Sequence, residues 1–388
     1  MFSYSHYLAD NLKIFDVVII GAGPAGCSAA LTFKNSNYKV ALIDKHSFPR
    51  EKICGDGLCD RSINVLKKLS PSYFEEFLQL SPSKKINKTY IFYNSKKYNV
   101  GFDNYGYTIE RKKFDDFLLS LVKRDCSNVS ISENTKIINI EQKADSVLVY
   151  SANGNVFSCK ILILASGQNS TLINFLNVSP DKNAKSAFTI RAYFENVESV
   201  DNDTIEIHYD KKVFPGYFWI FPVDENKVNV GFGLKYNKKR NMKSIFEDWI
   251  QQPYIKKRFK NSTQLSALKG SFIPYNTGNY NIAGDRFLIA GDSASLADPF
   301  SFAGIGNAML SGNFAASTCL SCLELNKFDY LTTKKYEVAL KSRILKEASF
   351  RLKIQRILTS NKYILDIVAF LGNANVVLNY FKRYYFKK

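Results

Sequence analysis

The sequence predicts an α/β protein in which an antiparallel β-sheet is inserted into a parallel-sheet domain and a helical region follows at the C-terminus. Three observations support this fold class. A strand, a glycine-rich turn, a helix and a second strand follow one another between residues 16 and 45. Alternating apolar and polar residues between 187 and 234 are typical of antiparallel strands. Short buried strands return near residues 161 and 287, and the remaining chain has a helical pattern.

The N-terminal element has the pattern of a dinucleotide-binding turn. The apolar run Val17–Ile20 is typical of a buried parallel strand and leads directly into Gly21-Ala-Gly-Pro-Ala-Gly26. Gly21 allows the tight turn, Gly23 lets the backbone approach a phosphate, and Gly26 lets the helix pack closely on the strand. The helix N-terminus offers N–H groups and partial positive charge to a pyrophosphate. The pattern therefore predicts a Rossmann-like cradle.

A second strand over residues 39–43 ends at Asp44, where a carboxylate can accept hydrogen bonds from ribose hydroxyls. The elements expected after it, in chain order, are a loop 46–58, a helix 60–69, a strand 88–93, a helix within 108–122, strands 129–132 and 136–141, and a strand 161–165. Asn153-Gly154 predicts a hairpin with a type I′ turn.

The pattern changes near residue 185. Strands are expected at 187–194, 204–209, 217–221 and 227–234, followed by one helix over 242–257, a strand 286–290 and a helix from Gly304. We expect a discontinuous cofactor-binding domain (1–81, 106–181 and 281–330), an inserted substrate-binding domain (82–105 and 182–280) and a basic helical region (331–388). A length of 388 residues with 46% hydrophobic content permits a core of this size.

Composition restricts the surroundings of the protein. No window approaches the ~18 uncharged apolar residues of a spanning helix, and no signal peptide is expected before Asp16. Seven scattered cysteines predict free thiols in a reducing cytoplasm, with Cys319 and Cys322 as a buried helix pair. No set of side chains has the spacing of a metal site, so no metal is expected.

The net charge is +18, and thirteen Lys or Arg residues stand against three acids between Lys334 and Lys388. The chain ends YFKRYYFKK, which interleaves rings with cations. This pattern suits peripheral contact with an anionic membrane, such as the inner face of a cell membrane. The alternative is compositional drift toward lysine, with the lysines simply solvated. Nucleic acid ranks lower as a partner because no recognised binding motif is present.

Three further segments carry a family resemblance. They are Phe48-Pro-Arg-Glu-Lys-Ile-Cys-Gly-Asp-Gly-Leu58, Gly216-Tyr-Phe-Trp-Ile-Phe-Pro222 and Gly291-Asp-Ser-Ala-Ser-Leu-Ala-Asp-Pro-Phe-Ser-Phe-Ala-Gly-Ile305. Together with the glycine turn, they resemble the geranylgeranyl reductase family of FAD-dependent oxidoreductases, which uses the para-hydroxybenzoate hydroxylase type of fold. The resemblance covers residues 15–325. It implies hydride transfer from reduced flavin to isolated C=C bonds of a prenyl chain.

The resemblance also implies the cofactor site. FAD would contact Gly21, Gly23, Gly26, Asp44, Gly55, Arg111, Gly167, Gly291, Asp292, Gly304, Ile305 and Gly306. No second glycine fingerprint is present, so NAD(P)H would dock transiently or another carrier would supply electrons. The sequence departs from the family pattern at two places, and both bear on reductant use and proton delivery. Ser166-Gly167 stands where many relatives have Asp-Gly, and Phe302-Ala303-Gly304 where many have Gly-Glu-Gly.

Tyr217, Trp219 and Phe221 alternate, so on a strand they share one face. Gly231 and Gly233 share a face of the returning strand, and a register that set them opposite the rings would give an aromatic-walled groove with an open side. The resemblance favours substrate lining over a plain core stripe. The groove would suit a long apolar prenyl or lipid-like molecule.

The candidate proton donor is the thiol of Cys54 or an ordered water near it, and the resemblance places this cysteine near the flavin ring. The positive neighbours Arg50 and Lys52 could tune its thiol, and the flanking Gly55 and Gly57 suggest unusual backbone angles beside a bulky group. A loop cysteine without chemistry is the alternative.

Two other functions stay open: a flavin-dependent aromatic hydroxylase or halogenase on the same fold, and a basic flavoprotein that binds membrane or RNA without small-molecule turnover.

Overall fold

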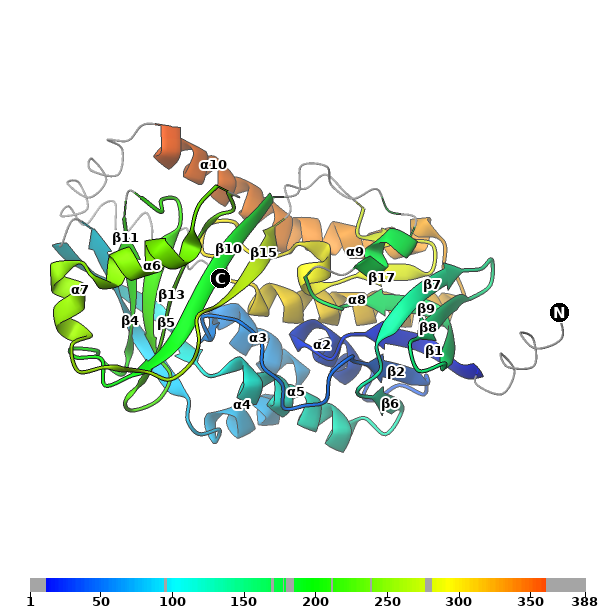
Figure 1. The fold of residues 1–388 in the computed structure, drawn as a ribbon. Helices are drawn as coiled ribbons and strands as arrows, with labels where there is room; N and C mark the ends of the chain where they lie inside the picture. The colour runs from blue at the N-terminus through cyan, green and yellow to red at the C-terminus, as the bar shows by residue number, and fades with distance from the viewer. Residues whose placement is uncertain are drawn as a thin grey trace.

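The computed structural model describes residues 12–93, 96–168, 171–176, 178, 185–210, 212–237, 239–275 and 281–360. These residues form two β-sheets that occupy the two ends of an elongated molecule (Figure 1). The strands of the two sheets alternate along the chain, because residues 57–58, 84–108 and 185–275 contribute to the second sheet and lie between parts of the first. The exact domain boundaries drawn from the sequence stay a prediction.

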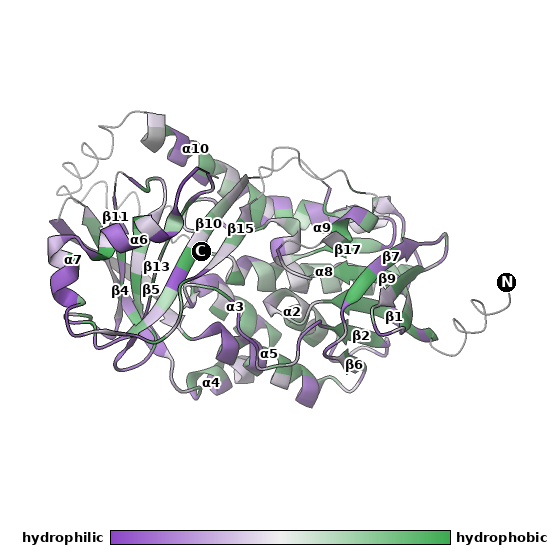
Figure 2. Cartoon of the chain, in the orientation of Figure 1, coloured by the Kyte–Doolittle hydropathy of each residue, from purple (hydrophilic) through white to green (hydrophobic). Residues whose placement is uncertain are grey.

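The first sheet has the order β16-β17-β9-β1-β2-β6. Its parallel strands are β1 (Leu12–Ile20), β2 (Val40–Ile43), β6 (Val129–Ser132), β9 (Val156–Leu164) and β17 (Phe287–Ile289). β16 (Ala283–Gly284) and the hairpin of β7 (Ile137–Gln142) and β8 (Val147–Ser151) pair antiparallel. Burial on both faces explains the continuous apolar runs of β1 and β2, which Figure 2 shows as hydrophobic.

Helices pack beside this sheet, and the first of them begins at its glycine turn. They are α2 (Pro24–Thr32), α3 (Asp60–Leu69), α4 (Pro71–Leu78), α5 (Arg111–Asp125) and α8 (Ile305–Leu325). A Cβ atom on Gly312 of α8 would lie 2.0 Å from the carbonyl oxygen of Ala25 in α2. The two helices therefore meet backbone to backbone, which brings the start of α8 to the same edge of the sheet as the start of α2.

The second sheet has the order β14-β10-β13-β12-β11-β4-β5-β3, with β15 also pairing with β10. Its strands are β3 (Gly57–Leu58), β4 (Lys84–Tyr93), β5 (Lys96–Thr108), β10 (Lys185–Glu195), β11 (Thr204–Tyr209), β12 (Tyr217–Pro222), β13 (Lys227–Lys235), β14 (Thr263–Gln264) and β15 (Lys269–Tyr275). The predicted antiparallel arrangement is confirmed except between β11 and β4, which run parallel. β3 ties the loop after β2 into this sheet through β5.

Two local predictions are wrong. The helix expected over 242–257 is two helices, α6 (Met242–Ile250) and α7 (Pro253–Arg258), because Pro253 cannot donate the hydrogen bond that would continue the first and instead begins the second. The hairpin at Asn153-Gly154 is present, but of these two residues only Gly154 has a positive φ, +84°, so the turn is not type I′.

The C-terminal region is helical as far as the structure describes it. α9 (Tyr330–Leu340), a π-helical turn (Lys341–Leu345) and α10 (Lys346–Ser360) follow α8, and α10 packs through Leu352 near Ala187 of β10 and Tyr275 of β15 (Figure 1). Residues 361–388, which include the basic aromatic end, lie outside the described residues. Among the helices of the described part, none is long and apolar enough to cross a membrane.

Candidate functional site

A pyrophosphate cradle forms where β1 enters α2. Gly21 has φ +105°, and a Cβ atom there would lie 2.3 Å from the carbonyl oxygen of Ala165. A Cβ atom on Gly26 would lie 1.7 Å from the carbonyl oxygen of Gly21. No side chain caps α2 at Gly23, so the N–H groups of its first turn face the cavity without a side-chain acceptor. The predicted reasons for Gly21 and Gly26 are thus both visible as contacts.

Asp44 lies at the end of β2 and is buried. Its Oδ2 accepts the N–H of Ala22 at 2.8 Å, and its Oδ1 accepts the N–H of His46 at 2.9 Å. Asp44 therefore fixes the glycine turn as well as lining the cavity. A carboxylate can accept about four hydrogen bonds, so capacity for ribose hydroxyls remains.

Arg50 is a residue of the cradle that sequence reasoning assigned elsewhere. Its Nη2 lies 3.4 Å from the position of a Cβ on Gly23 and 3.3 Å from Oδ2 of Asp115. Arg111 holds the same carboxylate through Nε and Nη2 at 2.7 and 2.8 Å. Two guanidinium groups share one buried carboxylate, so the local charge is positive. This positive charge and the uncapped start of α2 together suit a pyrophosphate. The residues of the cradle therefore fit FAD.

The remaining predicted cofactor residues lie on the same cavity. Gly291 begins a 3₁₀ turn (Gly291–Ala294) with φ +63°, and Oδ1 of Asp292 lies 3.6 Å from the position of a Cβ on Gly304, the N-cap of α8. Lys52 lies 4.0 Å from Asp292. The other members that line the cavity are Gly55, Gly167 with φ +82°, Ile305 and Gly306. A second uncapped helix start thus borders the cavity at α8.

The cavity has a volume of about 1400 Å³ and extends from the cradle to the second sheet. Tyr217, Trp219 and Phe221 all line it. The register that the sequence left open does set the glycines opposite the rings, since Tyr217 pairs with Gly233 and Trp219 with Gly231. The expected open side is wrong, because rings fill the space. A Cβ on Gly231 would lie 2.6 Å from Cζ2 of Trp219, and one on Gly233 would lie 3.1 Å from Phe302.

Two neighbouring strands, which the sequence predicted without assigning them to the site, extend this wall. Thr89, Ile91 and Tyr93 of β4 pair with Ile205, Ile207 and Tyr209 of β11, and all six line the cavity. Their alternation along each strand was the available signal, but the parallel pairing of β4 with β11 was needed to place them in rows beside β12. The result is a long, mainly apolar surface.

The loop of Cys54 lies where the cradle meets this wall. A Cβ on Gly55 would lie 3.5 Å from both Trp219 and Phe221, so the expected approach to a bulky group is confirmed. The expected unusual angles at the glycines are wrong: the positive φ, +66°, falls on Asp56 between them. Asp56 is fully buried and accepts hydrogen bonds from Tyr193 at 2.6 Å and Asn229 at 2.7 Å.

Burial raises the pKa of the Cys54 thiol above its ordinary value of 9.0. The charge of Arg111 and hydrogen bonds from the Asp56 N–H and the Arg111 guanidinium oppose this effect without reversing it. Arg111 is the principal cation at this thiol, and the expected Lys52 also interacts with it electrostatically. The thiol therefore stays protonated at neutral pH, and two donors are in place for the thiolate that deprotonation would leave.

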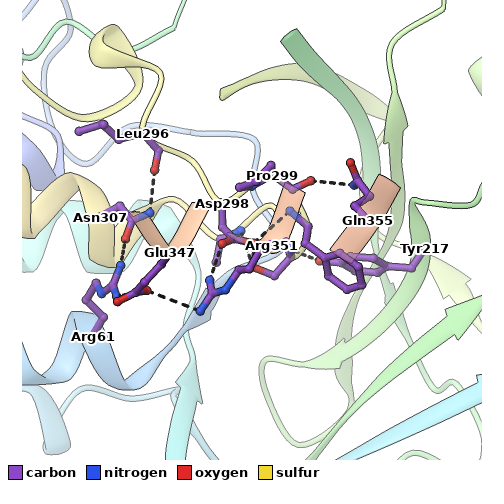
Figure 3. A network of polar contacts seen from close by, with 12 residues as sticks. Arg61, Tyr217, Leu296, Asp298, Pro299, Asn307, Glu347, Arg351 and Gln355 are labelled. Carbon is purple, nitrogen blue, oxygen red and sulfur yellow. Dashed lines mark hydrogen bonds and ion pairs between the residues drawn. The ribbon is translucent and has the colours of Figure 1, made fainter. Parts of the chain in front are cut away.

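The C-terminal helix closes one side of the cavity (Figure 3). Arg351 of α10 binds Asp298, and Glu347 accepts from Arg61 of α3 at 2.7 Å. Gln355 donates to the carbonyl oxygen of Pro299 at 3.1 Å, and the Tyr217 hydroxyl donates to that of Ser301. These contacts fix the loop between the Gly291 turn and α8. None of the site residues predicted from the sequence lies on α10. The contacts of α10 join segments 50 or more residues apart, and no local pattern indicates them.

A glycine cradle for a dinucleotide, two helix starts on one cavity and an apolar wall on a second sheet define an FAD-dependent oxidoreductase. Among the described residues no group of side chains could hold a metal ion. Residues 15–208 match the pyridine nucleotide-disulphide oxidoreductase family, and residues 185–271 match the geranylgeranyl reductase catalytic domain. The chain belongs to the geranylgeranyl reductase family of FAD-dependent oxidoreductases.

Known relatives agree with this assignment. A digeranylgeranylglycerophospholipid reductase of Methanocaldococcus jannaschii is 28% identical, with 89% of this chain and 87% of the relative covered. A menaquinone reductase of Mycobacterium tuberculosis is 26% identical, covering 78% and 75%. A geranylgeranyl bacteriochlorophyll reductase-like protein of Thermoplasma acidophilum superposes with a TM-score of 0.81 at 21% identity, covering 96% and 97%. A halogenase in complex with FAD shares the fold, with a TM-score of 0.70 at 19% identity over 83% and 72%.

Proposed function

We propose that this protein reduces isolated C=C bonds of a prenyl chain carried by a lipid, a quinone or a pigment precursor. The observation that carries the proposal is that Cys54 and the aromatic residues of β12 line the same cavity as the glycine cradle. The relatives whose names specify a glycerophospholipid or menaquinone support a substrate of this class. NAD(P)H or another external carrier would supply the electrons.

The wall of the second sheet has the properties that such a substrate needs. Bound FAD supplies the hydride. An isolated double bond is electron-rich, so one of its carbons must receive a proton while the other receives the hydride. The apolar rows of β4, β11 and β12 would hold the chain along the sheet and exclude water from the double bond.

Cys54 is the proposed proton donor. Its S–H bond breaks as a C–H bond forms on the alkene carbon, and the electron pair stays on Sγ as a thiolate. Arg111 and the N–H of Asp56 stabilise that thiolate, and a proton from water restores the thiol. The raised pKa of the thiol keeps the donor form present at neutral pH.

Cys54→Ala should lower the rate of prenyl-chain reduction by about 10²–10⁴-fold, the range for loss of a general acid, while FAD content stays normal. Because the thiol must be protonated to act as the donor and its pKa is raised, the wild-type rate should be flat near neutral pH and fall only above pH 9. Single-turnover reduction of geranylgeraniol with dithionite as the reductant, under anaerobic conditions, measures both effects.

Cys322→Ala is the matched control, because that thiol is buried in α8 away from the cavity lining. It should retain the wild-type rate. Unchanged turnover in Cys54→Ala with normal flavin content would remove Cys54 from the mechanism. Oxygen uptake coupled to hydroxylation of an aromatic substrate, without alkene reduction under anaerobic conditions, would instead favour the hydroxylase or halogenase alternative.

The basic helical region is proposed to contact an anionic membrane. The exposed cations of α9, the π-helical turn and α10 are Lys334, Lys335, Lys341, Arg343, Lys346, Lys353 and Arg356, and Leu331, Val338 and Ile357 are exposed among them. Each cation near anionic lipid contributes about 1 kcal/mol. Deletion of residues 377–388 removes four further cations and should strongly weaken flotation with phosphatidylglycerol vesicles. Undiminished binding after the deletion, or equal binding to phosphatidylcholine vesicles, would contradict the proposal.

A further inference from the structure

Asn229 of β13 is a fully buried amide that joins three segments of the site. Its Nδ2 donates to the carbonyl oxygen of Cys54 at 2.8 Å and to Oδ2 of Asp56 at 2.7 Å. Its Oδ1 accepts the indole Nε1–H of Trp219 at 2.9 Å. Both amide hydrogens and the amide oxygen are therefore in use, and one side chain connects the Cys54 loop to the aromatic wall.

Asp56 fixes which way this amide points. An ionised carboxylate can only accept hydrogen bonds, so the NH₂ end of Asn229 must face it and the oxygen must face Trp219. Burial raises the pKa of Asp56 to about 6, which leaves the carboxylate ionised at neutral pH. Tyr193 donates to the same Oδ2 at 2.6 Å, and the N–H of Arg111 donates to Oδ1 at 3.2 Å.

The Trp219 ring has glycine on two sides. The position of a Cβ on Gly231 lies 2.6 Å from Cζ2, and that of a Cβ on Gly55 lies 3.5 Å from Cε2 and 3.6 Å from Nε1. Because glycine lacks a side chain, neither residue adds a side-chain contact to the ring. Tyr217 and Phe221 flank it at centroid distances of 6.2 and 6.0 Å. The hydrogen bond to Asn229 thus adds a directional restraint to a buried ring whose other contacts named here are non-directional packing contacts.

We propose that Asn229 is the positioning residue of the reduction, which sets the Trp219 ring and the Cys54 backbone in one fixed arrangement. A prenyl chain resting on Trp219 would then present its double bond at a constant height beside the thiol. A misplacement of about 1 Å at a reacting centre can cost 10²-fold in rate. The catalytic part of this inference rests on the proposed function, while the restraint on Trp219 does not.

Asn229→Leu removes all three hydrogen bonds with little change in side-chain volume. Tyr193→Phe is the matched control, because it also deprives buried Asp56 of a donor but leaves the bonds to Trp219 and Cys54 intact. Asn229→Leu should lose more stability than Tyr193→Phe, because it removes three buried hydrogen bonds instead of one. Only Asn229→Leu should lower kcat for geranylgeraniol reduction, by ten-fold or more with KM within three-fold, while Tyr193→Phe stays within two-fold of wild type.

A spectroscopic arm tests the restraint in the FAD-loaded protein without turnover. The chain has two tryptophans, so ¹⁵N-indole labelling gives two resonances, and Trp249→Phe assigns them. The Trp219 indole proton should move upfield and broaden in Asn229→Leu, and stay in place in Tyr193→Phe. If Asn229→Leu does not fold, Trp219→Phe breaks the same bond from its other end and should reproduce the kcat loss with FAD retained.

Three results would overturn the inference: an unmoved Trp219 resonance in Asn229→Leu, equal kcat losses in Asn229→Leu and Tyr193→Phe, or Trp219→Phe with wild-type kcat. A wild-type protein that reduces no prenyl double bond would instead reject the proposed function, and the indole resonance would still decide whether Asn229 restrains the ring. The two failures are therefore distinguishable.

Discussion

Gly26→Ala is expected to yield a protein that retains no FAD. The new Cβ atom would lie 1.7 Å from the carbonyl oxygen of Gly21, a distance that no side-chain adjustment can relieve because the obstacle is backbone. The start of α2 must move away from the end of β1, and this same backbone forms the pyrophosphate cradle. We expect the dissociation constant for FAD to rise by at least 100-fold, roughly 3 kcal/mol. Flavin absorbance of the purified protein and titration with FAD measure it.

Gly154→Ala is the control for this experiment. Gly154 has a positive φ, +84°, and lies in the turn between β8 and β9, away from the cavity. Its replacement should cost about 1 kcal/mol of stability through backbone strain and leave FAD binding unchanged. A Gly26→Ala protein purified with full flavin content would show that the cradle can relax, and the predicted role of this glycine would be wrong.

Glu206→Gln is expected to destabilise the protein by about 3–5 kcal/mol, because it leaves the buried guanidinium of Arg258 without a counter-charge. Arg258 holds both oxygens of Glu206 at 2.7 and 2.8 Å, and Nε2 of His208 lies 3.0 Å from Oε2. Burial alone would raise the pKa of Glu206, but hydrogen bonds from His208 and Arg258 hold it below its ordinary value. Urea unfolding of the FAD-loaded protein at pH 7 measures the loss.

The matched control is Glu247→Gln on α6. Glu247 pairs with Lys243 at 3.7 Å one helical turn away, and both side chains are largely exposed. Loss of such a surface pair should cost less than about 0.5 kcal/mol. If Glu206→Gln were as mild as Glu247→Gln, the buried network beneath the second sheet would not stabilise it, and the role assigned to these residues would be rejected.

Local patterns in the chain predicted much of the fold. The helix at 60–69 and the strands at 129–132 and 204–209 have the predicted bounds, because their apolar spacing and flanking residues are local properties. α4 and β15 were not predicted. α4 begins at Pro71 and buries Tyr73, Phe74 and Phe77 at helical spacing, a signal that the prediction from sequence did not use. β15 contains Pro274, which weakens the signal of a strand. The boundary of α6 was missed because its apolar pattern continues past Pro253.

The residues of the candidate site likewise divide into those that local spacing predicts and those that depend on contacts across the fold. Gly21, Gly26 and Asp44 lie within one strand–turn–helix–strand unit, where spacing alone places them around the turn. Arg50, Asp56 and Asn229 were given other roles or none. Their significance depends on contacts between segments separated by 65 to 173 residues, as between Arg50 and Asp115 and between Asp56 and Asn229.

The sequence by itself determined the glycine cradle, the alternation of the aromatic strand and the shared face of Gly231 and Gly233. These features follow from steric rules and side-chain periodicity, which act between residues close in the chain. Only the tertiary structure decided that Trp219 and Phe302 fill the glycine space, that α10 closes the cavity, and that burial keeps the Cys54 thiol protonated. Such outcomes depend on desolvation and on contacts across the fold, which no local pattern encodes.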